Sequence, residues 1–217
     1  MPSQMTFNSL QEDMRNYLER GFTAESDPIV YEQLPKLINL AERQLATELK
    51  VLGYQESVTS AFETGVCVYA KPDRWRETIS MNFGTGTNNN TRNPIFARSY
   101  EYITSYWPDR TAVDAPEYYG DYDFNHFIVV PTPDADYPFE MMAWMLPALL
   151  DDTNQTNWST EIIPQALLYG ALLQATPFLK NDERLQVWTG MYDRAVAGIN
   201  GEDLARIMDR AAQRTTS

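Results

Sequence analysis

The sequence predicts an α+β fold, mainly α, in which helices at both ends of the chain flank a small antiparallel β region. Apolar residues recur at helical spacing before residue 52 and after residue 158, whereas short strand-like segments lie in the part between them. The 217 residues, 43% of them hydrophobic, suffice for one substantial domain. We therefore predict a single domain, 1–217, with a helical core at about 6–52 and 158–213 and a β-rich insertion at about 53–150.

The first helical part contains two predicted helices. Leu10, Met14 and Leu18 lie on one face of the first helix, and Asp27-Pro28 offers a cap and a first-turn proline for the second. The second helix has an apolar stripe of Leu34, Leu37, Ile38, Ala41, Leu45 and Leu49. Its opposite face includes Glu42, which we expect to face solvent.

Strands are expected in the middle of the chain. The first two, at 66–70 and 76–83, are predicted to be joined by a turn that holds Asp73-Arg74-Trp75. A short helix is expected at 99–107. Three further segments should be the strands of a small antiparallel sheet; they span 118–122, 126–130 and 137–144.

The C-terminal part is strongly helical. Ser159 or Thr160 is expected to cap a helix that is apolar nearly all round, a pattern typical of a buried helix. Asn181-Asp182 should separate this helix from the next, which Asn200-Gly201 should close. A last helix is predicted at about 202–213.

The charge balance indicates that the chain is not a DNA-binding module. Thirty acidic against 17 basic residues give a net charge of −13, whereas a protein that grips phosphate backbones should be basic. The acidity keeps the chain soluble, or it marks a surface past which DNA must slide without sticking. Net charge alone does not separate these interpretations.

Residues that could carry chemistry are few. His126 is the only histidine, and its place at the start of a strand favours a structural or exposed role over a catalytic one. The pairs Asp121/Asp123 and Asp134/Asp136 have a spacing that can hold Ca²⁺ or Mg²⁺, but aspartate also favours turns for its own hydrogen bonding. We predict no enzyme, no catalytic, cofactor-binding or metal-ligating residue, and no cofactor.

The order of several motifs resembles a known family. A strand, Gly65-Val66-Cys67-Val68-Tyr69-Ala70, is followed by Lys71-Pro72-Asp73-Arg74-Trp75. Near the end, Ile163-Pro164-Gln165-Ala166-Leu167-Leu168-Tyr169-Gly170-Ala171-Leu172 precedes Phe178-Leu179-Lys180-Asn181-Asp182-Glu183 and Trp188-Thr189-Gly190-Met191-Tyr192. The chain thereby resembles the head-to-tail adaptor (connector) protein family of short-tailed double-stranded DNA bacteriophages.

The resemblance implies a helical bundle with a β insertion and a structural role in the virion. It implies a homo-oligomeric ring, typically of twelve copies, between the portal protein and the tail tube or nozzle protein. DNA would pass through the channel without specific binding, and no membrane would be involved. The segment at about 200–217 would reach the portal and the segment at about 84–126 would face the tail. Such a protein is made in the host cytoplasm and resides at the head-tail junction of the virion.

Two alternatives stay open. One is a metal-dependent hydrolase that uses Asp121, Asp123, Asp134 or Asp136. The other is a tail-terminator or another phage morphogenesis factor, which shares the location but not the stacking position.

Overall fold

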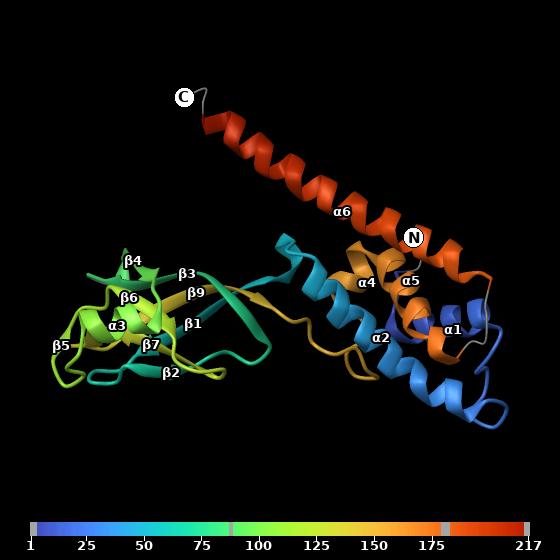
Figure 1. Cartoon of the computed structure of the whole chain (residues 1–217), viewed down its shortest axis with the longest axis horizontal. Helices are drawn as coiled ribbons and strands as arrows, with labels where there is room; N and C mark the ends of the chain where they lie inside the picture. The colour runs from blue at the N-terminus through green and yellow to red at the C-terminus, as the bar shows by residue number, and fades with distance from the viewer. Residues whose placement is uncertain (1–3, 87–88, 179–182, 215–217) are drawn as a thin grey trace. The chain divides into compact units, whose positions relative to one another are not determined.

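The computed structural model describes residues 4–86, 89–178 and 183–214. The chain clusters into two compact units (Figure 1). We call Met1–Tyr54 with Leu146–Ser217 the helical unit and Gln55–Met145 the β unit. Gln55 pairs with Trp144, so the chain enters and leaves the β unit at the same end of one strand pair.

The helical unit is organised around one central helix. Its elements are α1 (Phe7–Leu18), α2 (Pro28–Glu48), the 3₁₀ turn η1 (Leu52–Tyr54), α4 (Trp158–Ile162), α5 (Pro164–Gln174), the 3₁₀ turn η3 (Thr176–Phe178) and α6 (Leu185–Arg214). Helix α5 contacts α1, α2, α4 and α6, so its uniformly apolar surface is buried as predicted. A Cβ at Gly170 would lie 3.2 Å from the Tyr192 ring and 3.4 Å from Ala41. This glycine therefore lets α6 and α2 approach α5 closely.

Of two predicted helix caps, the structure confirms one and contradicts the other. Asp27 caps α2 by accepting a hydrogen bond from the backbone N–H of Val30, as predicted. The prediction of Ser159 or Thr160 as the cap of α4 is wrong. Asn157 is the cap, and its side chain accepts from the backbone N–H groups of both residues. Ser159 and Thr160 are buried instead.

Helix α6 is longer than predicted. It continues from Leu185 to Arg214 through Asn200-Gly201, so the expected break there, with a separate helix at 202–213, is wrong. Asparagine and glycine have low helix propensity, but a low propensity weakens a helix without ending it. The predicted separator Asn181-Asp182 lies outside the described residues.

The β unit is built on a seven-stranded mixed sheet. The strand order is β1-β9-β3-β4-β6-β7-β2, and neighbours are antiparallel except for β4 and β6, which are parallel. The strands are β1 (Gln55–Phe62), β2 (Val68–Ala70), β3 (Trp75–Thr85), β4 (Thr91–Ala97), β6 (Tyr118–Asp121), β7 (His126–Val130) and β9 (Tyr137–Met145). The unit also contains helix α3 (Tyr100–Tyr106) and a two-stranded sheet of β5 (Val113–Asp114) and β8 (Thr132–Pro133).

The sheet curls so that its first and last strands meet. The ring of Phe62, at the end of β1, lies 5.1 Å from the ring of Tyr69 in β2 and stacks on Phe139 at 4.4 Å. The hydroxyl of Tyr69 donates to the carbonyl of Val66 at 2.6 Å and accepts from the backbone N–H of Glu63 at 3.0 Å. The core inside the curl is formed by Phe62, Met81, Phe83, Ile95, Tyr119, Phe127, Val129, Phe139, Met141, Ala143 and Met145.

The predicted fold class needs correction. The chain is not a mainly helical bundle with a small antiparallel insertion, because 27% of it is strand beside 41% helix, and one curled seven-stranded sheet dominates the topology. Strands β1 and β4 were not predicted. The two strands expected to be joined by a turn, β2 and β3, are not neighbours in the sheet, since β2 pairs with β7 and β3 with β4 and β9. The predicted short helix at 99–107 is confirmed as α3.

Candidate assembly groove

Asp121 and Asp123 interact with a lysine and a histidine side chain of the same chain. Asp121 forms an ion pair with Lys71 at 2.7 Å, and Asp123 contacts the Nδ1 atom of His126 at 2.9 Å. The hydrogen bond from the His126 side chain is the main reason why the pKa of Asp123 lies below its usual value. His126, which is partly exposed, thus helps to hold the turn before β7.

The pair Asp134/Asp136 also serves local structure. Asp134 accepts a hydrogen bond from the Tyr137 hydroxyl at 2.7 Å, and Asp136 accepts from the backbone N–H of Thr64 at 2.8 Å. Among residues 4–86, 89–177 and 183–201, whose side chains the structure describes, no three histidine, cysteine or acidic residues gather in a group that could hold a metal ion. In the same part of the chain, no helix is long and apolar enough to cross a membrane.

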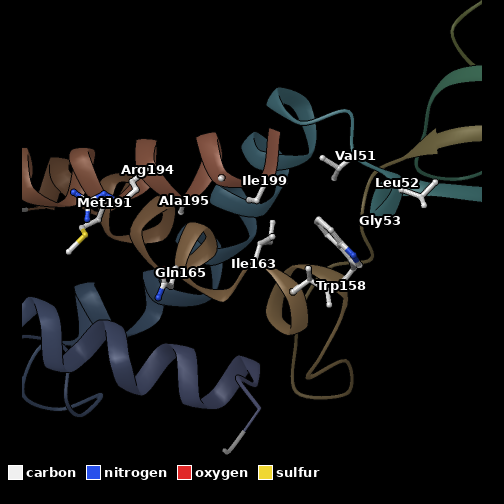
Figure 2. Close-up of a pocket in the computed structure, with 12 residues that line it drawn as sticks. Val51, Leu52, Gly53, Trp158, Ile163, Gln165, Met191, Arg194, Ala195 and Ile199 are labelled. Atoms are coloured by element: carbon white, nitrogen blue, oxygen red, sulfur yellow. The ribbon is translucent and has the colours of Figure 1, made fainter. Parts of the chain in front are cut away.

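The helical unit contains an open groove of about 800 Å³. It lies between α6, the start of α5, α4 and the segment that follows α2 (Figure 2). Its lining is mostly apolar and consists of Val51, Leu52, Gly53, Trp158, Ile162, Ile163, Gln165, Met191, Arg194, Ala195, Gly198 and Ile199. We call this feature the assembly groove.

Trp158 and Gly53 form one wall of the groove. The indole ring lies directly against the glycine, because a Cβ at residue 53 would stand 2.0 Å from it. The same ring packs edge-on against Tyr54 at 5.0 Å, and the hydroxyl of Tyr54 contacts the Ser159 hydroxyl at 3.1 Å. Contacts from both η1, which follows α2, and helix α4 therefore hold this wall in place.

A buried carboxylate fixes α4 in place. Glu42 was predicted to face solvent, but it is only 1% exposed and accepts a hydrogen bond from the Asn157 side chain at 2.5 Å. Asn157 thus joins α2 to the cap of α4. Burial raises the pKa of Glu42, and the hydrogen bonds from Asn157 and Ser159 oppose that rise.

Helix α6 forms the opposite wall of the groove. Trp188 and Tyr192 are buried and anchor the helix, and the Tyr192 hydroxyl donates to Glu48 at the end of α2 at 2.6 Å. Met191, which is 38% exposed, and Ile199 lie on the groove side of the helix. The groove thus has walls held by hydrogen bonds and aromatic packing, and its lining residues are mostly apolar.

The groove has the chemistry of a protein-binding surface. The described residues that line it include no Ser, Cys, His, Asp or Glu, so they offer no nucleophile and no general base. Ile162 and Leu52 are 61% and 49% exposed, and Arg194 supplies a cation at the edge. Exposed apolar residues rimmed by polar ones are typical of protein contacts. This site was not predicted from the sequence, although the uncharged segments 51–53 and 162–163 beside Trp158 were a signal for it.

A second surface lies on the β unit around α3. Tyr102 and Tyr106 are 43% and 41% exposed, and both rings contact Tyr118. The guanidinium of Arg98 lies over Tyr102 at 5.5 Å. We call Arg98, Tyr102, Tyr106 and Tyr118 the tyrosine surface. Phe124, in the turn before β7 of the same unit, is 87% exposed. Tyrosine and arginine are enriched in the residues that dominate protein-protein affinity.

The comparisons with known proteins point to one family. The profile of the SU10 adaptor protein family matches residues 5–216, which is nearly the whole chain. The resemblance to a phage adaptor family is confirmed by this match. No curated protein matches the chain.

Proposed function

Because the chain belongs to the SU10 adaptor protein family, and is therefore a structural adaptor protein of a phage virion, we propose that it forms a ring at the head-tail junction. In this proposal the ring stacks between the portal and the tail tube or nozzle, typically in twelve copies, and DNA passes through its channel. The observation that carries the proposal is the family match over residues 5–216.

The surfaces of the helical unit support a role in assembly. The chain offers a groove lined mostly by apolar residues, and its described lining holds no group suited to catalysis. Each subunit of a ring needs two different contact surfaces, one for each neighbour. The assembly groove provides one surface of this kind.

Helix α6 is the part that we propose for the portal side. Its 30 residues span about 45 Å at 1.5 Å per residue, whereas the 11 residues of α5 span about 16 Å. Helix α5 therefore covers less than half of α6, and the C-terminal part of α6 extends beyond it (Figure 1). An extended helix of this kind suits docking into a groove of another protein.

We propose the tyrosine surface, together with Phe124, for the tail side. Both belong to the segment at about 84–126, which the family resemblance assigns to the tail. Exposed rings such as Tyr102, Tyr106 and Phe124 bury much apolar area at little cost in side-chain entropy when a partner covers them.

The net charge of −13 supports the channel role. A lining that repels phosphates lets the duplex slide, whereas a basic lining would bind it. The finding that would count against this part is tight binding of the chain to duplex DNA at physiological salt.

Two variants test the proposed orientation. Deletion of residues 202–217 should abolish binding to the portal protein of the same phage and leave binding to the tail protein intact. Phe124→Ser should weaken tail binding and leave portal binding intact, and each variant is the control for the other. If both variants keep both partners, the proposed assignment of the two ends is wrong.

A further inference from the structure

The loop between α1 and α2 exposes two large apolar side chains. Phe22 is 53% exposed and Ile29, in the first turn of α2, is 66% exposed. Glu25, between them in the sequence, is also exposed. A partner that covered this pair would remove apolar surface from water, which is favourable. We call Phe22–Ile29 the apolar loop.

The apolar loop has a defined conformation. Gly21 has a φ of +68°, and a Cβ there would lie 2.9 Å from a methyl carbon of Val30. Thr23 and Ser26 bond to each other, with the Ser26 N–H donating to the Thr23 hydroxyl at 3.0 Å. Because the backbone is fixed in this way, the loop would lose little conformational entropy on binding.

The apolar loop and the assembly groove lie at opposite ends of one helix. The loop leads into α2 at Pro28, and the groove-lining residues Val51, Leu52 and Gly53 follow the end of α2 at Glu48. The 21 residues of α2 separate the two features by about 31 Å. A projection at one end of a helix and a receptor at the other end can serve as the two different surfaces of a head-to-tail contact.

We propose that the apolar loop of one copy of this chain inserts into the assembly groove of a second copy. Phe22 and Ile29 fill the apolar lining beside Trp158 and Ile162, and a groove of about 800 Å³ has room for more than one large side chain. Glu25 of the loop meets Arg194 at the groove edge, so the charges are complementary. Repetition of this contact closes a ring or extends a filament.

This contact would join neighbouring subunits of the proposed ring, so its biological role rests on the proposed function. The contact itself needs no other virion protein. The occupant of the groove is therefore a second copy of this chain. A groove that takes another protein instead would leave the copies unlinked in the experiments below.

Disulfide trapping tests the contact directly. Glu25→Cys and Arg194→Cys are made in separate chains, each with Cys67→Ala, and one carries a mass tag. After mixing and mild oxidation, we expect the mixed 25–194 dimer to exceed both like-with-like dimers at least fivefold. Leu40→Cys, at a residue 55% exposed on α2, replaces Glu25→Cys as the matched control and should give no such excess. A statistical mixture, or an equal excess with Leu40→Cys, would overturn the proposal.

Complementation gives a second, independent readout. Phe22→Asp blocks the loop and Ile162→Arg blocks the groove, and both side chains are exposed, so folding should survive and circular dichroism can check it. Each variant alone should stay monomeric in native mass spectrometry, whereas their mixture should stop at dimers. Larger assemblies from either single variant, or no dimer on mixing, would contradict the proposal.

The two proposals fail in distinguishable ways. A chain that forms the 25–194 link but ignores the portal would sink the proposed function and leave this contact standing. A chain that forms a ring on the portal without the link would sink this contact alone.

Discussion

The indole of Trp158 lies so close to Gly53 that a Cβ at residue 53 would stand 2.0 Å from the ring. The indole ring cannot rotate away to relieve this contact, because it also packs against Tyr54. We expect Gly53→Ala to lower the free energy of unfolding by about 1–3 kcal/mol through overpacking, as measured by urea denaturation.

Gly190 offers the matched control for this substitution. It lies in α6, and a Cβ there would meet nothing within 4 Å. Gly190→Ala should therefore raise the free energy of unfolding by about 1 kcal/mol through better helix propensity. Similar effects at the two positions would show that the Trp158 contact is not responsible.

Glu42→Gln should stabilise the protein at neutral pH. Burial raises the pKa of Glu42 above its usual 4.5, so the folded chain holds this proton more tightly than the unfolded chain. The stability from this group is complete below pH 4.5 and is lost as pH rises through the raised pKa. Glutamine keeps an oxygen acceptor for Asn157 without the buried charge. Unfolding free energies at a series of pH values should show a weaker pH dependence for the variant.

Glu42→Leu separates the charge from the hydrogen bond. It removes the buried carboxylate but leaves the Asn157 side-chain N–H without its acceptor, at a cost of about 1–3 kcal/mol. We expect it to be less stable than Glu42→Gln at every pH. Equal stability of the two variants would mean that Asn157 does not depend on residue 42.

Tyr192→Phe should loosen α6 from α2. The lost hydrogen bond to Glu48 is short and accepted by a carboxylate, and we expect a cost of about 1 kcal/mol in the free energy of unfolding. A double-mutant cycle with Glu48→Ala, which removes the acceptor, isolates this pair. Strictly additive effects in the cycle would argue against the contact.

Tyr69→Phe should loosen the closure of the curled sheet. The ring stays and keeps its packing on Phe62, but the hydroxyl bonds to Val66 and Glu63 are lost. Hydrogen exchange should become faster at Glu63, whose N–H bonds the hydroxyl, while β9 stays protected. Unchanged exchange at Glu63 would show that the hydroxyl does not hold the strand ends together.

Helix features could be predicted where they depend only on residues that are neighbours in the sequence. The buried all-round pattern of α5 and the cap at Asp27 depend on neighbouring residues alone, and both predictions are confirmed. The cap at Asn157 was missed because Ser159 and Thr160 are equally good caps by residue type. Asn157 also contacts Glu42, which is 115 positions away in the sequence, and such a contact does not follow from neighbouring residues.

The sheet was less predictable because pairing is not local. Strand β1 alternates weakly, since it lies at the edge and buries only Phe62. Strand β4 contains Pro94, a residue that argues against a strand by propensity. The groove could not be predicted for a similar reason: segments 51–53, 158–165 and 191–199 meet only after α4 and α6 have packed on α5.

The most direct test of the central claim is the mass of the purified chain, measured by light scattering alone and after mixing with the portal protein of the same phage. The account predicts a complex whose mass exceeds that of the portal assembly by several copies of this chain. A mixture in which both proteins keep their separate masses would contradict the adaptor ring.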